Sequence, residues 1–149
     1  MPWWKNAVHR LLSQKDQERI VAAIAAAELR TSGEIRVHVE ATSGGDPLAA
    51  ARRWFVRLGM QKTAHRNGIL IYVAVDERAF AIAGDDGIHV HVGDDFWNAV
   101  RDALREDFAR GAFADGLVRA IGVTGDRLAA HFPRETGDRN ELPDEISGG

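Results

Sequence analysis

The sequence predicts a single α/β domain in which helices pack on one small mixed sheet. Its 149 residues are enough for one hydrophobic core and too few for two. Apolar residues recur with helical spacing in some stretches and alternate or run continuously as in strands in others. These stretches follow the order α-β-α-β-β-α-α. A strand–helix–strand unit joined to a hairpin places parallel and antiparallel strands in one sheet. The domain is expected at residues 1–133, followed by a polar, disordered tail at residues 134–149.

Four stretches carry apolar residues at helical spacing and are predicted to be amphipathic helices. The first three follow residues that favour the position before a helix, namely Ser13, Asp46 and either Asp94 or Asp95. Glycines near the helix ends and a proline at the first position of the second helix agree with these starts. The helices are expected at about residues 14–30, 47–58, 95–110 and 113–131.

Three stretches are predicted to be strands, at about residues 33–41, 68–75 and 79–83. The first alternates apolar and polar side chains, which is the pattern of a strand with one face in solvent. Its polar side chains, expected to be solvated, are Glu34, Arg36, His38 and Glu40. The second is continuously apolar, which favours a central strand covered on both faces, and the third returns from it as a hairpin. A further short extended piece is expected at residues 88–92.

Composition excludes several kinds of site. The formal charge is −3, with 19 basic and 22 acidic side chains, so no basic surface for nucleic acid is expected. The absence of cysteine excludes disulfides, thiolate metal sites and cysteine nucleophiles. The longest apolar run, residues 69–75, is far shorter than a membrane span. Because the first residues lack the pattern of an export signal, a cytoplasmic location is expected.

Four short segments resemble those of a known family. They are Ser-Gly-Glu-Ile-Arg-Val from residue 32, Arg-Asn-Gly-Ile-Leu-Ile-Tyr from residue 66, Gly-Asp-Asp-Gly-Ile-His from residue 84 and Val-Gly-Asp-Asp-Phe-Trp from residue 92. In this order and spacing they resemble the TPM domain, and especially its short stand-alone bacterial members, over about residues 10–133. The resemblance implies a Rossmann-like α/β/α sandwich, divalent metal binding (calcium above all) and a proposed phosphatase, that is hydrolase, activity.

The topology brings several acidic residues to one edge of the predicted sheet. If the first two strands are parallel, their starts lie on the same edge, and the hairpin returns to that edge at residues 84–87. Carboxylates together with loop carbonyls are the oxygen ligands that Ca²⁺ or Mg²⁺ prefers. The predicted metal ligands are Glu34, Asp85, Asp86 and Asp95.

Each of these acids also has a plainer interpretation. A helix cap explains Asp94 or Asp95, a glycine-bounded turn explains residues 85–86, and solvation explains Glu34. The metal interpretation therefore depends on their convergence. A rival site is open at the opposite edge, because parallel α/β sheets usually bind ligands beyond the carboxyl ends of their strands. The rival acids are Asp46, Asp76, Glu77 and Asp115.

Histidines offer a different set of ligands. His89 and His91 lie on one face of the expected extended piece, as a pair of zinc ligands would. Protein zinc sites normally use three or four ligands, and His38 is the third candidate. Two imidazoles do not make a site, so the acids remain the preferred ligands.

Two functions are compatible with these residues. The favoured one is a divalent-metal-binding domain with a structural role or a protein partner, because it needs only the predicted acids. The alternative is metal-dependent phosphomonoester hydrolysis, in which a carboxylate-held ion activates water and Lys62, His65 and Arg66 hold the phosphate of a phosphorylated small molecule. The sequence contains no cysteine nucleophile, no P-loop and no serine-hydrolase motif. No catalytic residue is therefore assigned.

Overall fold

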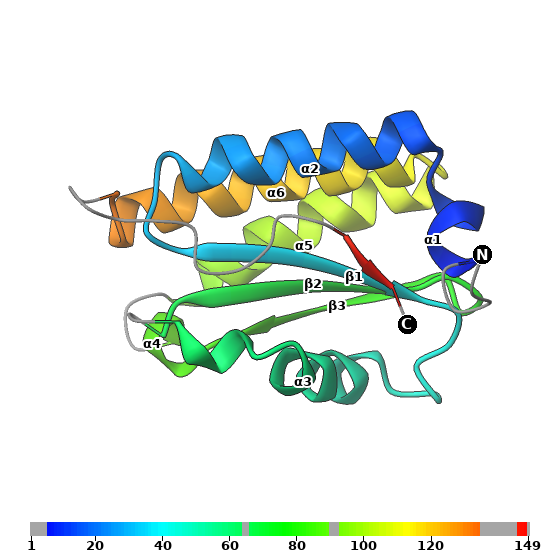
Figure 1. Ribbon diagram of the computed structural model, residues 1–149, viewed down its shortest axis with the longest axis horizontal. Helices are drawn as coiled ribbons and strands as arrows, with labels where there is room; N and C mark the ends of the chain where they lie inside the picture. The colour runs from blue at the N-terminus through cyan, green and yellow to red at the C-terminus, as the bar shows by residue number, and fades with distance from the viewer. Residues whose placement is uncertain (1–5, 64–65, 90–92, 135–145, 149) are drawn as a thin grey trace.

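Helices cover both faces of a four-stranded mixed sheet in the computed structural model (Figure 1). The structure describes residues 6–63, 66–89, 93–134 and 146–148. The strands are β1 (Glu34–Glu40), β2 (Gly68–Ala74), β3 (Ala79–Gly84) and β4 (Ser147–Gly148), in the order β3-β2-β1-β4 across the sheet. The expected α/β sandwich with a small mixed sheet is confirmed.

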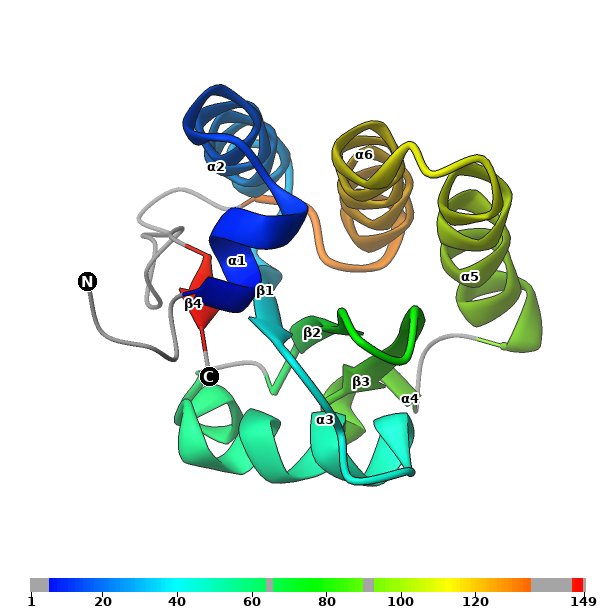
Figure 2. The ribbon, with the colours of Figure 1, turned by 90° about the vertical axis from the view of Figure 1, so that its right-hand side faces the viewer.

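The helices form two layers of unequal size. They are α1 (Asn6–Leu11), α2 (Gln14–Glu28), α3 (Pro47–Arg57), α4 (Asp86–His89), α5 (Asp94–Ala109) and α6 (Phe113–His131), with a short 3-10 helix, η2, at Met60–Lys62. Figure 2 shows α2, α5 and α6 on one side of the sheet and α3 on the other. The larger layer encloses the main core, which includes Ile24, Ile71 and Leu104. No helix in the described ranges is both long enough and apolar enough to cross a membrane.

The strand register places three chain segments at one end of the sheet. β1 and β2 are parallel, with Glu34 opposite Gly68. β2 and β3 are antiparallel, and the ladder continues past Gly84, where the Asp85 amide donates to the carbonyl of Gly68 at 3.0 Å. The starts of β1 and β2 and the end of β3 therefore meet, as the sequence predicts.

Two local expectations differ from the structure. Residues 86–89 form a turn of helix, α4, so residues 88–89 are helical where the sequence predicts the start of an extended piece. The rest of that piece, residues 90–92, lies outside the described residues. Helix α5 has Gly93 at its N-cap, so neither Asp94 nor Asp95 caps it; both lie in its first turn, where negative charge favours the helix dipole. By contrast Ser13 accepts a hydrogen bond from the amide of Asp16, and Asp46 from that of Ala49, as capping residues do.

The polar face of β1 is buried, which corrects the prediction that it faces solvent. Glu34, Arg36 and His38 are 2%, 8% and 0% exposed. The indole of Trp54 in α3 stacks on His38 with ring centroids 3.9 Å apart, and its Nε1 donates to the Glu40 carboxylate at 3.0 Å. Alternation along β1 distinguishes the two faces of the strand correctly, but the polar face is covered. At His38 and Glu40 the cover is α3, because its Trp54 stacks on the imidazole and donates to the carboxylate.

The end of the chain adds a strand to the sheet. Ser147 and Gly148 pair in parallel with His38 and Val39 of β1, and the Ser147 hydroxyl lies 2.8 Å from Nδ1 of His38. The prediction of a disordered tail is therefore wrong for these two residues. Residues 135–145 lie outside the described part of the chain.

Candidate functional site

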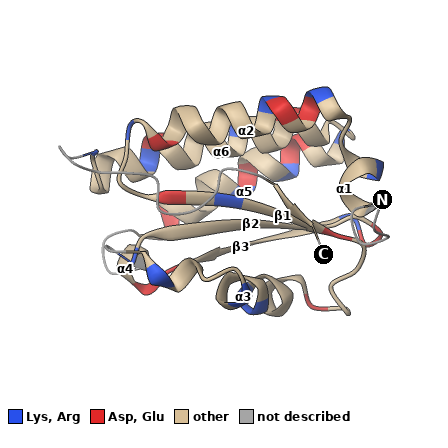
Figure 3. Cartoon of the chain, in the orientation of Figure 1, with Lys and Arg blue, Asp and Glu red and all other residues tan. Residues whose placement is uncertain are grey.

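The end of the sheet where β1 begins carries two buried acids, on the two strands that flank β2. Glu34 starts β1 opposite Gly68, and Asp85 follows β3 with its amide bonded to the carbonyl of the same Gly68. With about 4.8 Å between adjacent strands, the two acids are rooted on either side of β2, about 10 Å apart. Figure 3 shows acidic and basic residues side by side here, at the start of β1 and around α4. We call this region the Asp85 end.

Asp85 is the best-defined group at this end, with only 3% of its surface exposed. One carboxylate oxygen, Oδ1, accepts a hydrogen bond from the Asp86 amide at 2.7 Å and another from Nε of Arg66 at 3.0 Å. The other, Oδ2, is buried and accepts none from the described residues. An unbonded buried carboxylate oxygen costs free energy, so this oxygen marks a place where a donor or a cation would stabilise the protein.

Arg66 supplies the positive charge beside these acids. Its Nη2 lies 3.8 Å from Oδ2 of Asp86, while Nε holds Asp85. Its φ of 52° is in the left-handed region, which is uncommon for a residue other than glycine and carries a conformational cost. The guanidinium predicted to bind phosphate is thus directed at two carboxylates.

A groove of about 1020 Å³ begins at the Asp85 end and continues between α3 and α5. Its acidic lining consists of Asp85, Asp86 and Asp94. Of the four predicted metal ligands, the structure therefore brings Asp85 and Asp86 together. Glu34 lies on β1, on the far side of Gly68 from Asp85, and does not line the groove. Asp95 is exposed and does not line the groove either. In the part of the chain that the structure describes, no three acids or histidines are arranged as a set of metal ligands.

The other predicted ligands are dispersed. Lys62 ends η2 with its side chain exposed and does not line the groove. His65 and His91 lie outside the described residues, and nothing about the side chain of His89 is described. His38 is buried under Trp54 and bonded to Ser147.

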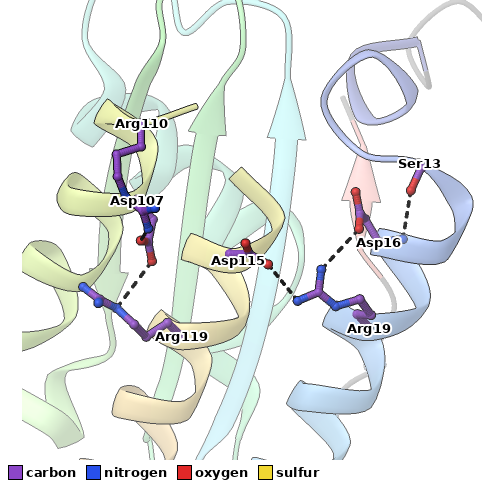
Figure 4. A network of polar contacts seen from close by, with 7 residues as sticks. All are labelled: Ser13, Asp16, Arg19, Asp107, Arg110, Asp115 and Arg119. Carbon is purple, nitrogen blue, oxygen red and sulfur yellow. Dashed lines mark hydrogen bonds and ion pairs between the residues drawn. The ribbon is translucent and has the colours of Figure 1, made fainter. Parts of the chain in front are cut away.

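The opposite end of the sheet holds the rival acids, each engaged by donors or cations of the protein. Asp46 caps α3, and Asp76 pairs with Arg10 at 2.9 Å. Figure 4 shows Asp115 paired with Arg19, which also reaches Asp16; the Asp115 contact measures 2.8 Å. These acids stabilise local structure instead of forming a common site.

Glu77 is the most strongly bound acid at that opposite end, which we call the Glu77 end. Its carboxylate accepts hydrogen bonds from the hydroxyl and the amide of Ser43, the latter at 2.6 Å, and from the hydroxyl of Thr42 at 3.1 Å. The Ser43 hydroxyl is the main reason why the pKa of Glu77 lies below its ordinary value. The carboxylate is held in its ionised form.

Close to the Glu77 end lies a polar cluster that the sequence does not predict. Tyr72 and Trp54 both donate to the Glu40 carboxylate. Burial, and then the hydrogen bond with Glu40, raises the pKa of Tyr72. Burial lowers the pKa of His38 to about 4, with the nearby Arg36 acting in the same direction. The sequence shows that Trp54, Tyr72 and His38 are aromatic residues able to form hydrogen bonds, but their positions in the sequence do not indicate that they lie together.

Comparison with known proteins agrees with the fold. The profile of the TPM domain matches residues 7–127. The NMR structure of the BA42 protein from the psychrophilic bacterium Bizionia argentinensis shares 46% sequence identity with this chain, with a TM-score of 0.89. The alignment covers 93% of this chain and 95% of BA42. None of the curated proteins matches the chain.

Two more distant structures share the fold alone. The N-terminal domain of a protein from P.gingivalis is 18% identical, with a TM-score of 0.66, over 82% of this chain and 79% of that one. The N-terminal domain of cg2496 from Corynebacterium glutamicum is 21% identical, with a TM-score of 0.60, over 78% and 73% of the two chains. The architecture therefore persists where most residues differ.

Proposed function

Because the chain belongs to the TPM domain family, we propose that it binds a divalent cation, Ca²⁺ or Mg²⁺, at the Asp85 end. One observation carries the proposal: Oδ2 of Asp85 is buried and accepts no hydrogen bond from the described residues. Two further acids, Asp86 and Asp94, line the same groove and are exposed. Asp85 and Asp86 both lie against Arg66, and a hard cation bound between neighbouring carboxylates reduces their mutual repulsion.

The ion would replace Arg66 as the partner of Asp85. The Arg66 side chain is 53% exposed, so it is free to turn into solvent when a cation approaches. Asp85 would be the central ligand, with Asp86 and Asp94 as the nearest additional carboxylates. Glu34 and Asp95, the remaining predicted ligands, would have to approach from outside the groove lining. Ca²⁺ suits such a site better than Mg²⁺, since it accepts irregular oxygen coordination.

This function is non-catalytic, with the ion ordering one end of the domain. The phosphomonoesterase alternative gains no support from the described residues, because Arg66, its proposed phosphate ligand, lies against two carboxylates that would repel phosphate. A phosphatase activity that copurifies with the folded protein and disappears in Asp85→Asn would establish that alternative.

Calorimetric titration with Ca²⁺ tests the proposal, with Asp76→Asn at the Glu77 end as a matched control for Asp85→Asn. We expect Asp85→Asn to weaken binding at least about tenfold and Asp76→Asn to leave it unchanged. Arg66→Gln should bind Ca²⁺ more tightly than wild type, since it removes the competing cation. Ion binding to the folded state alone should stabilise the wild type by about 2.7 kcal/mol at a hundredfold excess over Kd.

Three results would count against the proposal. Wild-type affinity in Asp85→Asn combined with a loss in Asp76→Asn would move the ion to the Glu77 end. Weaker binding by Arg66→Gln would mean that Arg66 supports the site instead of competing for it. If wild type binds neither Ca²⁺ nor Mg²⁺, the metal function is wrong.

A further inference from the structure

The outermost strand β3 has an edge that pairs with no strand among the described residues. Paired and unpaired positions alternate in an antiparallel ladder. Because the Asp85 amide donates to Gly68, the same alternation turns the main-chain groups of Phe80 and Ile82 away from β2. A row of such free amide and carbonyl groups is a template for a further strand.

The groove from the Asp85 end follows this free edge. Residues 80–84 of β3 contribute its floor, and α3 and α5 contribute its walls. Figure 2 shows these two helices on opposite sides of β3. Three large apolar side chains are exposed among the described residues, and two of them, Leu48 at 41% and Val56 at 60%, are on the α3 wall. Trp97 lines the α5 wall.

Both walls also carry positive charge. Arg52 of α3 and Arg101 of α5 line the groove and are exposed. Arg52 forms no ion pair with the residues that the structure describes, and the ion pair of Arg101 is with its own neighbour, Asp102, at 3.7 Å. The acids Asp85, Asp86 and Asp94 lie at one end of the groove, so its charge changes sign along its length.

We propose that the free edge of β3 binds an extended acidic peptide segment of a partner protein by strand addition. Successive side chains of an added strand point alternately to the two faces of the sheet, and therefore alternately to α3 and α5. Two adjacent acidic residues at the centre of the segment then meet Arg52 and Arg101. Apolar residues on either side of them contact Leu48, Val56 and Trp97. Main-chain hydrogen bonds supply affinity, and the side-chain contacts supply specificity.

A single added strand fits this edge better than a second copy of the domain does. Pairing of two β3 strands across a two-fold axis would bring the α3 and α5 walls of both copies together, with like charges of Arg52 and Arg101 on each. An acidic segment meets the same walls with opposite charge. The inference does not depend on the proposed ion, because it uses the floor and the walls of the groove and no acidic ligand.

Fluorescence polarisation with a labelled peptide of about eight residues, matched to the six residues of β3, tests the proposal. The peptide has two central glutamates flanked by threonine and valine, and a second version has lysines in place of the glutamates. We expect the glutamate peptide to bind at least about tenfold more tightly, with an affinity that falls as salt rises. Arg52→Glu/Arg101→Glu should reverse this preference. The double variant Arg105→Glu/Arg127→Glu, with the same change of charge at exposed positions outside the groove, should keep it.

Main-chain pairing has a separate readout that needs no protein variant. N-methylation of alternate peptide amides, those facing β3, should abolish binding, while methylation of the intervening amides should not. The amide signals of Phe80 and Ile82 should shift in the NMR spectrum when the peptide is added. Equal binding of the glutamate and lysine peptides, or of both methylated forms, would overturn the proposal. So would a dimer of the domain that peptide displaces, because it assigns this edge to a second copy.

Discussion

The two ends of the sheet carry similar numbers of acids but differ in the hydrogen bonds and ion pairs that those acids receive from the protein. At the Glu77 end, each acid is neutralised by the protein: Asp46 caps a helix, Asp76 pairs with Arg10, and Glu77 accepts hydrogen bonds from Ser43 and Thr42. At the Asp85 end, a buried carboxylate oxygen accepts no hydrogen bond from the described residues, and one arginine is shared by two acids. The two ends therefore differ in how completely the protein supplies donors to their acids, and not in how many acids they carry.

The largest expected effect is a loss of stability at low pH, caused by His38 in the polar cluster beside the Glu77 end. Burial lowers the pKa of His38 to about 4 from its ordinary value of 6.5. The unfolded chain therefore binds a proton more readily between those values, and stability is lost as pH falls from about 6.5 to 4, by about 3 kcal/mol in all. Denaturant unfolding across this window measures the loss.

The matched variants for that experiment are His38→Phe, which keeps an aromatic ring against Trp54, and His131→Asn at an exposed position. The contribution of His38 to the pH dependence should disappear in the first and remain in the second. An unchanged slope in His38→Phe would mean that other groups produce the pH dependence.

The next effect compares one glycine from each end. A Cβ on Gly84 would lie 2.2 Å from Cη2 of Trp97, so Gly84→Ala should cost about 1–3 kcal/mol through overpacking. At the other end Gly44 has open space but a φ of +80°, and Gly44→Ala should cost about 1 kcal/mol through backbone strain alone. Thermal unfolding of both variants measures these costs. In a Trp97→Leu background the cost of Gly84→Ala should shrink, and an unchanged cost would refute the steric cause.

A smaller effect separates the acids at the two helix starts. Asp46→Ala should destabilise the protein by about 1 kcal/mol, because it removes the cap of α3, whereas Asp46→Asn should restore most of that stability. Asp94→Ala should change stability less, since Asp94 caps nothing at the start of α5. Unfolding in urea would show this order. Equal losses in Asp46→Ala and Asp94→Ala would mean that capping does not distinguish the two ends.

The smallest effect is a change in titration. Ser43→Ala removes the hydroxyl that chiefly lowers the pKa of Glu77, so that pKa should rise toward its ordinary value. NMR titration of the Glu77 carboxyl carbon measures the shift, with Ser13→Ala at the start of α2 as the control. No change in Ser43→Ala would show that Thr42 and the backbone suffice to hold the carboxylate ionised.

Much of the fold and part of the site followed from local patterns. The expected strand at residues 68–75 agrees with β2, and the expected helix at residues 113–131 matches α6. The convergence of Glu34, Asn67–Gly68 and Asp85 followed from strand direction alone, because parallel starts and a hairpin return share one edge. The prediction of which side chains are buried was wrong for β1. The polar face of β1 was expected in solvent, and it is covered.

The sequence by itself determined the periods of the elements, their order and the capping of α2 and α3, since these depend on residues within one or two turns of each other. The tertiary structure decided which acids are satisfied. Arg66 meets Asp85 across 19 positions of sequence, Trp54 covers His38 from another layer, and Ser147 reaches His38 from the end of the chain. Burial and charge pairing are properties of neighbours in space, and no local pattern contains them.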